Sequence, residues 1–159
     1  MDEQAFSAVY AATAKPLWRY IARVSGRQEI ADELLQECYF RLLRSERADL
    51  EPSDARPYLF RIATNLLHDL HRKGQELSLD DIGEPAVETR CEASLDASRM
   101  LRRLKPRARQ LLWLAYMEGM THKEIASITG LNVMSIRILL LRARRQAQAL
   151  LAGKEGDHV

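Results

Sequence analysis

The chain has 159 residues, of which 47% are hydrophobic and 29% are charged, and its net charge is +2. This balance excludes a disordered polar tail, because it supplies enough apolar surface to form a core. No run approaches the roughly 18–20 apolar residues of a membrane-spanning helix, and the first residues lack the basic-then-apolar pattern of a secretory signal. Helix formers dominate between the glycines and prolines. We therefore expect an all-α, cytoplasmic protein without membrane insertion.

Charge is distributed unevenly along the chain. Residues 1–73 carry 11 basic and 11 acidic residues, residues 74–98 carry 1 and 7, and residues 99–159 carry 12 and 4. A basic C-terminal third favours a polyanionic partner, for which the acidic segment cannot compete. We expect two small helical domains, 1–73 and 99–159, joined by a flexible acidic linker at 74–98. Neither apolar pattern requires the other, so the domains are expected to move independently, and a closed state held by contact between the domains is the alternative.

Two helices are predicted in the first 44 residues. Apolar residues recur at helical spacing from Glu3 to Val24, where Pro16 either kinks or divides the helix. The stretch from Glu29 to Arg44 forms a second, amphipathic helix with Cys38 on its apolar face. Cys38 and Cys91 have no CxxC spacing, so neither a zinc site nor a disulfide is expected. Cys38 fits a core position, whereas Cys91 lies in the polar linker, where an exposed thiol remains open.

A third helix follows a loop at residues 45–54. It is predicted from Ala55 to Lys73, with Pro57 in its first turn. Its apolar face is formed by Leu59, Ile62, Ala63, Leu66 and Leu70, and its polar face by Arg61, Thr64, Asn65, His68 and Arg72.

The C-terminal third predicts a helix-turn-helix over His122–Leu140, after a helical pattern that breaks at Lys105-Pro106 and continues to Glu118. Thr121 and Glu124 form a capping box, Gly130 ends the short helix, and Asn132 caps the last one. Two helices joined by a short glycine-containing turn are typical of DNA-binding proteins. A plain helical hairpin is the alternative, which the basic residues Arg137, Arg142, Arg144 and Arg145 make less favourable.

Three segments resemble a known family. LKPRARQLLWLAYMEGMTHKEIASITGLNVMSIRILLLRAR is similar to region four of the extracytoplasmic-function (ECF) sigma factors, whose helix-turn-helix recognises the minus-thirty-five promoter element. ADELLQECYFRLLR resembles region 2.2 of that family, and ARPYLFRIATNLLHDLHRK resembles regions 2.3 and 2.4. The matches occur in the family's order and flank the acidic segment. The resemblance implies a sigma factor that directs promoter recognition by RNA polymerase.

The resemblance also implies roles for individual residues. The region 2.2 helix of the family docks on the clamp helices of the largest polymerase subunit, and the matching residues are Asp32, Glu33, Gln36, Glu37 and Phe40. An acidic edge beside an aromatic ring suits a basic partner, although a solvated helix face is the alternative. Opening of the minus-ten element is assigned to Tyr58, Arg61, Asn65, His68 and Arg72. Tyr58 stands where the family often has Trp, but a core position for Tyr58 and structural roles for Arg61 and Asn65 remain alternatives.

The last helix presents two kinds of side chain opposite its expected core face of Ile136, Leu140, Ala143 and Ala147. The minus-thirty-five contacts are expected from Thr121, Ser135, Arg137, Arg142 and Arg145. Met134, Ile138 and Leu141 form an exposed apolar stripe, which we interpret as a partner-binding surface covered by an anti-sigma factor or by the N-terminal domain. Contact with thymine methyls is the alternative.

Other functions explain less of the sequence. A hydrolase built around His68, Asp69 and His71 would need further metal ligands, and no phosphate loop or nucleophile elbow is present, so no enzyme, metal or cofactor is expected. A helix-turn-helix regulator would leave the region 2 resemblance unexplained, and a protein-binding adaptor would leave the basic C-terminus unused. The expected partners are core RNA polymerase (its clamp helices and flap), promoter DNA and an anti-sigma factor. The free chain is expected to be a monomer.

Overall fold

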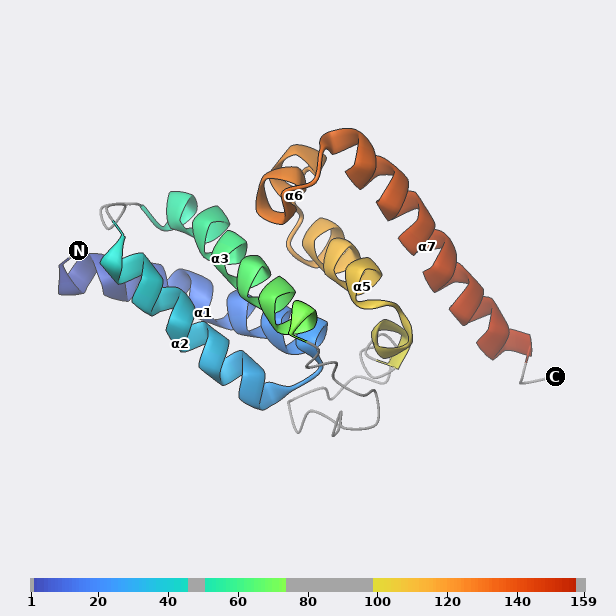
Figure 1. The fold of residues 1–159 in the computed structure, drawn as a ribbon, viewed down its shortest axis with the longest axis horizontal. Helices are drawn as coiled ribbons and strands as arrows, with labels where there is room; N and C mark the ends of the chain where they lie inside the picture. The colour runs from blue at the N-terminus through green and yellow to red at the C-terminus, as the bar shows by residue number, and fades with distance from the viewer. Residues whose placement is uncertain (1, 46–50, 74–98, 157–159) are drawn as a thin grey trace.

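The computed structural model describes residues 2–45, 51–73 and 99–156, and the elements in these ranges are all helices, which confirms the all-α class. Figure 1 shows an N-terminal group, α1 to α3, beside a C-terminal group that includes α5, α6 and α7. We call the described residues up to 73 the N-terminal module and those from 99 onward the C-terminal module. The predicted acidic linker and Cys91 lie outside the described residues.

Helix α1 (Glu3–Ser25) is continuous, and Pro16 lies inside it without dividing it. The Oδ1 atom of Asp2 accepts a hydrogen bond of 2.7 Å from the backbone N–H of Ala5 and caps the start. The helix ends at Gly26, whose φ of 77° is accessible to glycine at little steric cost. On both sides of Pro16, α1 contributes buried side chains to one core, and this shared packing offsets the lost backbone hydrogen bond.

Helices α2 (Gln28–Arg44) and α3 (Pro52–Arg72) complete the N-terminal module. Helix α3 begins before the predicted Ala55, because Pro52 occupies the first helical position, where its missing N–H removes no helical bond. Pro57 therefore lies inside the helix rather than in its first turn. Thr64 was predicted on the polar face but is fully buried, so that prediction was wrong. The hydroxyl of Thr64 is satisfied by Tyr20 of α1 at 2.7 Å.

The core of the N-terminal module includes Leu17, Ile21, Leu42 and Leu59, all fully buried. Cys38 is fully buried among them, which confirms the core interpretation. Burial raises the pKa of the Cys38 thiol to about 12, so the thiol stays protonated and unreactive at neutral pH.

The C-terminal module begins with a helical stretch at residues 99–103, followed by α5 (Pro106–Leu112). The helix predicted to continue to Glu118 instead widens into a π-helical turn, η2 (Trp113–Met117), in which the N–H of Glu118 bonds the carbonyl of Trp113 at 3.1 Å. The turn ends at Glu118, and Gly119 follows with a φ of 63°. The chain then enters the two C-terminal helices.

Helices α6 (His122–Thr129) and α7 (Val133–Gly156) form the predicted helix-turn-helix. The Oγ1 atom of Thr121 accepts from the N–H of Glu124 at 3.1 Å, and the Glu124 carboxylate accepts from the N–H of Thr121 at 3.2 Å, which confirms the capping box. Gly130 has a φ of 78°, and Asn132 Oδ1 caps α7 by accepting from the N–H of Ser135 at 2.8 Å. The two helices are inclined by 101°, within the range for DNA-binding motifs.

Among the described residues, no single helix is long and apolar enough to cross a membrane. Helices α6 and α7 meet the length and composition criteria when they are taken together, but only as a bent pair.

Candidate nucleic-acid and polymerase interfaces

Helix α7 separates buried and exposed side chains cleanly around its axis. Ile136, Leu140 and Ala143 are almost completely buried, and they pack with Ile125 and Ile128 of α6. The core face that the sequence predicts for α7 is therefore confirmed. The opposite face of α7 is open to solvent along its first four turns.

The residues predicted to contact the minus-thirty-five element do not all lie in equivalent positions. Arg137, Arg142 and Arg145 are exposed on α7. Ser135 is half-buried in the first turn of α7, and its N–H is used by the Asn132 cap. Thr121 is exposed but caps α6 with its hydroxyl, so a contact from Thr121 to DNA would share an oxygen that already has a structural role.

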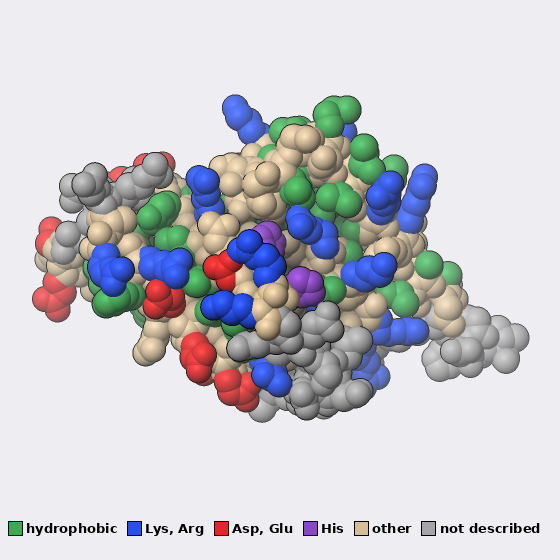
Figure 2. Space-filling view, in the orientation of Figure 1, with side chains coloured by type: hydrophobic (Ala, Val, Ile, Leu, Met, Phe, Trp, Pro, Cys, Tyr) green, Lys and Arg blue, Asp and Glu red, His purple; other side chains and the backbone are tan. Residues whose placement is uncertain are grey.

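The apolar stripe of α7 is also exposed, as expected. Met134, Ile138 and Leu141 are 64%, 49% and 45% exposed. Figure 2 shows hydrophobic and basic side chains side by side over α7. The described part of the N-terminal module does not cover this stripe, so the structure does not show the expected contact with the N-terminal domain.

The acidic edge of α2 faces solvent, with acidic side chains visible over α2 in Figure 2. Glu33 and Gln36 are exposed, and Glu37 is half-buried in an ion pair with Arg41 at 2.9 Å. Asp32 accepts a hydrogen bond of 2.8 Å from the indole N–H of Trp18, so it also ties α2 to α1. Phe40 is 52% exposed, and the guanidinium of Arg44 lies 4.8 Å from the centre of its ring.

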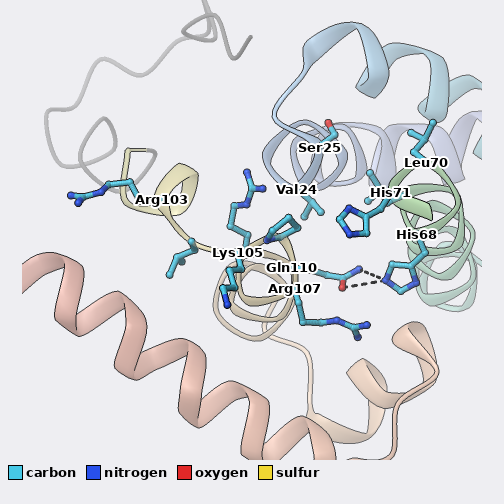
Figure 3. Close-up of a pocket in the computed structure, with 13 residues that line it drawn as sticks. Val24, Ser25, His68, Leu70, His71, Arg103, Lys105, Arg107 and Gln110 are labelled. Atoms are coloured by element: carbon cyan, nitrogen blue, oxygen red, sulfur yellow. Dashed lines mark hydrogen bonds between the residues drawn. The ribbon is translucent and has the colours of Figure 1, made fainter. Parts of the chain in front are cut away.

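The predicted minus-ten residues lie on one face of α3 but differ in exposure. Arg61, Asn65 and Arg72 are exposed, and Arg72 forms an ion pair with Asp69 on the same helix. Tyr58 is half-buried and packs against the core, as the structural alternative allowed. His68 is half-buried and points to the C-terminal module, where its Nε2 lies 3.4 Å from the side-chain amide of Gln110 (Figure 3).

The two modules are joined by a buried polar network. Gln110 of α5 donates from Nε2 to the hydroxyl of Tyr20 at 3.0 Å, and that hydroxyl also bonds Thr64 at 2.7 Å. Tyr20 is completely buried, and burial raises its pKa to about 12. Burial has the opposite effect on the pKa of His68, which it lowers because the charged imidazolium is disfavoured, and the nearby Arg107 and Arg72 lower this pKa further. The neutral forms of both groups therefore fit this interface.

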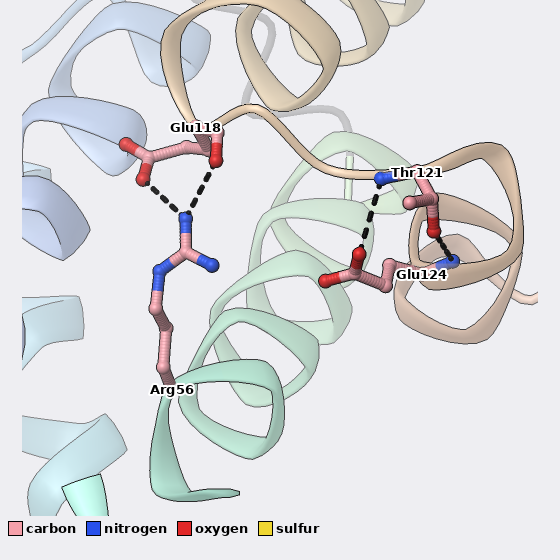
Figure 4. Close-up of polar contacts among 4 residues, drawn as sticks. All are labelled: Arg56, Glu118, Thr121 and Glu124. Carbon is pink, nitrogen blue, oxygen red and sulfur yellow. Dashed lines mark hydrogen bonds and ion pairs between the residues drawn. The ribbon is translucent and has the colours of Figure 1, made fainter. Parts of the chain in front are cut away.

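A second contact lies at the other end of α3. Arg56 Nη2 donates to the Glu118 carboxylate and to the Glu118 backbone carbonyl, each at 2.9 Å (Figure 4). The Arg56 guanidinium also lies 5.5 Å from the ring centre of Phe60, whose own ring packs against Tyr20 at 5.2 Å. The aromatic pair thus connects the ion pair to the polar network.

These contacts favour a closed arrangement, which is the alternative to modules that move independently. The network depends on polar side chains that the hydrophobic pattern does not select, namely Tyr20, Arg56, Gln110 and Glu118. Gln110 directly precedes the apolar run Leu111–Ala115, and a polar residue beside such a run is a sequence signal that could have indicated a buried partner. Among the described residues, no cluster of three or more His, Cys, Asp and Glu is arranged to hold a metal ion.

Comparison with known proteins agrees with this arrangement. Residues 9–76 match the family described as Sigma-70 region 2, and residues 94–146 match Sigma-70, region 4. ECF RNA polymerase sigma factor SigE of Mycolicibacterium smegmatis is 29% identical over 95% of this chain and 69% of its own length. ECF RNA polymerase sigma factor SigM of Bacillus subtilis is 25% identical over 89% of this chain and 92% of its own length.

Two solved structures have the same fold. The sigma factor RpoE of Bartonella quintana, solved with the anti-sigma factor NepR, gives a TM-score of 0.76 at 22% identity and covers 92% of this chain and 96% of its own. CnrH, solved with the cytosolic domain of CnrY, gives a TM-score of 0.70 at 24% identity over 96% of this chain and 90% of its own. With both sigma regions matched in order on two helical modules, the chain belongs to the ECF group of RNA polymerase sigma factors, which direct promoter recognition in transcription initiation.

Proposed function

We propose that this chain binds core RNA polymerase through α2, opens the minus-ten element with α3 and contacts the minus-thirty-five element with α7. It acts in the cytoplasm, as a monomer when free, and does so by binding rather than by catalysis. Residues 1–73 would serve as region 2, residues 74–98 as the linker and residues 99–159 as region 4. The observation that carries the proposal is the presence of an exposed acidic helix face and an exposed basic helix face on the two matched regions.

The polymerase contact is assigned to the acidic edge of α2. Glu33, Gln36 and Phe40 are exposed, so a partner can reach them without unfolding the module. A rim of carboxylates around an aromatic side chain favours a basic helical partner, such as the clamp helices. Asp32 contributes to this edge while its bond to Trp18 keeps α2 in place. The flap of the polymerase is the expected partner of the C-terminal module.

The minus-ten contact is assigned to the exposed face of α3. Arg61 and Asn65 lie one helical turn apart and can offer a phosphate anchor and a base-edge hydrogen bond side by side. Arg72 extends the same face. Tyr58 would supply its exposed ring edge to an unstacked base. His68 would join them only after Gln110 has moved away, because the two side chains face each other in this structure.

The minus-thirty-five contact is assigned to α7 and its cap. Arg137, Arg142 and Arg145 provide phosphate and guanine contacts, with Ser135 and Thr121 near the start of the motif. The stripe of Met134, Ile138 and Leu141 lies between these arginines and reads few base features, so base specificity would be loose. We assign the stripe chiefly to an anti-sigma factor, since the two solved proteins of similar fold were each solved with another protein bound, which for RpoE is the anti-sigma factor NepR.

A transcription assay with the purified chain tests the proposed function. The chain is added to sigma-free core polymerase and a promoter library, and start-site-specific transcripts are expected. Binding to duplex DNA without such transcripts would favour a conventional helix-turn-helix regulator. Binding to polymerase with neither transcripts nor DNA contact would favour a protein adaptor. Either outcome would overturn the proposal.

A further inference from the structure

A cavity of about 540 Å³ lies between the two modules, next to the His68–Gln110 contact (Figure 3). Val24 and Leu67 line it from the N-terminal module, and Leu104 and Pro106 line it from the C-terminal module. Its volume falls within the range of about 300–1,000 Å³ that is typical of small-molecule sites. The apolar part of the lining can accept the body of an organic ligand.

The polar part of the lining is strongly basic. Arg103, Lys105, Arg107 and Arg109 all contribute to it, together with His68 and His71. Among the described residues that line the cavity, none is an aspartate or a glutamate. Four cations without a carboxylate among them create a positive potential that favours an anionic group.

Arg109 differs from the other cations in its burial. Its side chain is only 6% exposed, and within the described part of the chain its Nε atom has no hydrogen-bond partner. Arg56, by comparison, is matched at the same interface by Glu118. Burying a guanidinium without a counter-charge is costly, so Arg109 would be stabilised by an anion that enters the cavity. Because two or more cations can approach one such group, a phosphate suits the lining better than a single carboxylate.

We infer that this cavity is a binding site for a small organic phosphate, whose phosphate contacts Arg109 and its basic neighbours and whose apolar body packs on Val24, Leu67 and Leu104. Both modules supply lining residues, so the ligand binds the packed arrangement and not the separated modules. By mass action, the ligand therefore stabilises the packing of the modules. This inference does not depend on which promoter elements the chain recognises.

Isothermal titration calorimetry of the full chain tests the inference, with ADP as the probe. Adenosine, which lacks the phosphates, and pyrophosphate, which lacks the apolar body, are the comparison ligands. Saturable ADP binding that is at least about tenfold tighter than binding of either fragment is expected. Arg109→Gln should weaken ADP binding by about tenfold, and Lys105→Gln should weaken it by a smaller factor. Lys15→Gln removes a charge from an exposed position outside the cavity and should leave the affinity unchanged.

Thermal unfolding of the free variants separates a ligand site from a structural arginine. If Arg109 is kept for an anion, Arg109→Gln should unfold at the same temperature as the wild type or higher, because an unpaired buried charge has been removed. ADP should raise the unfolding temperature of the wild type and not that of the variant. The inference is wrong if no probe binds saturably, if Arg109→Gln binds ADP like the wild type, or if an acidic amphipathic peptide binds in an Arg109-dependent manner while ADP does not.

Discussion

Gln110 donates a hydrogen bond to the hydroxyl of Tyr20 at 3.0 Å, although the two residues lie 90 positions apart in the chain. Both side chains are buried, and Tyr20 belongs to the N-terminal module whereas Gln110 belongs to the C-terminal module. A buried amide needs its partners, so this bond makes the packing of the modules specific as well as favourable.

Replacing Tyr20 by Phe should lower the free energy of unfolding by about 1–3 kcal/mol, because Thr64 and Gln110 both lose a buried partner. Urea denaturation monitored by circular dichroism measures the change. Tyr116→Phe is the matched control, since Tyr116 is 59% exposed. A loss in Tyr20→Phe no larger than that of the control would show that the network contributes nothing to stability.

Reversing the charge of Glu118 should separate the modules. The side chains of Arg56 and Glu118 are 32% and 10% exposed, so Glu118→Arg places two cations together where little water can screen them. Nuclear spin relaxation should then give different tumbling times for the two modules, in place of one common time in the wild type. The double variant Arg56→Glu, Glu118→Arg should restore part of the contact. A single tumbling time in Glu118→Arg would contradict this interpretation.

Acidification should weaken the protein through His68. Burial is the largest cause that lowers the pKa of His68 below its ordinary value of 6.5, so the unfolded chain takes up the proton more readily than the folded one. The contribution of neutral His68 is therefore complete above pH 6.5 and is lost as the pH falls below that value. Arg107 and Arg72 act in the same direction, whereas Gln110 and Asp69 oppose it.

The free energy of unfolding of the wild type should therefore rise with pH from about pH 5 to about pH 7. In His68→Gln, which keeps a hydrogen-bonding side chain next to Gln110, this rise should be smaller. Equal slopes in the two proteins would assign the pH dependence to other groups.

Charge reversal on α2 should weaken polymerase binding while preserving the fold. Glu33→Lys, Glu37→Lys changes side chains outside the core. The double variant also breaks the ion pair between Glu37 and Arg41, which contributes little to stability because water reaches both side chains. Affinity for core enzyme should fall by at least about tenfold at low salt, with unchanged helicity. Glu3→Lys, which reverses an exposed charge on α1 instead of α2, is the control. If both variants bind equally well, α2 is not the contact surface.

The apolar stripe of α7 should matter more for protein binding than for promoter binding. Ile138→Ser, Leu141→Ser removes exposed apolar area that an anti-sigma factor would bury, and should weaken that complex by about tenfold or more. Promoter affinity at matched salt should change by less. Leu151→Ser is the control, since Leu151 is similarly exposed, at 47%, near the other end of α7. Loss of promoter affinity with intact protein binding would assign the stripe to DNA.

Local features of the fold were predictable from the sequence, because their causes are local. The capping box at Thr121, the left-handed turn at Gly130 and the cap at Asn132 each depend on residues no more than four positions apart. The exposed stripe and the core face of α7 follow from the helical period alone. The predicted start of α3 at Ala55 is wrong because two prolines fit a first helical turn, and Pro52 rather than Pro57 fills that position.

Contacts between the modules were not predictable in the same way. Tyr20 has an apolar ring and a polar hydroxyl, so the helical pattern does not distinguish a tyrosine in the core from one at an interface. Thr64 lies at the border between two faces of α3, and its burial depends on Tyr20. The contact of His68 depends on α5, and the position of Glu118 depends on the π-helical turn. No periodicity in the sequence predicts this turn. The sequence allowed packed modules as an alternative, but no residue pattern favoured them over modules that move independently.

Helix α3 has a buried side that packs against Tyr20 of α1 and a side that is exposed to solvent. Phe60 and Thr64 are buried and contact Tyr20, which bonds Gln110 of the C-terminal module, while their immediate successors Arg61 and Asn65 face solvent. Consecutive codons in this helix therefore encode different properties: the first of each pair affects the packing around Tyr20, and the second affects the exposed face that we propose for promoter contact. In a genetic screen, variants at adjacent positions of α3 should fall into separate phenotypic classes, with variants that lower stability next to variants that keep the fold and lose promoter binding.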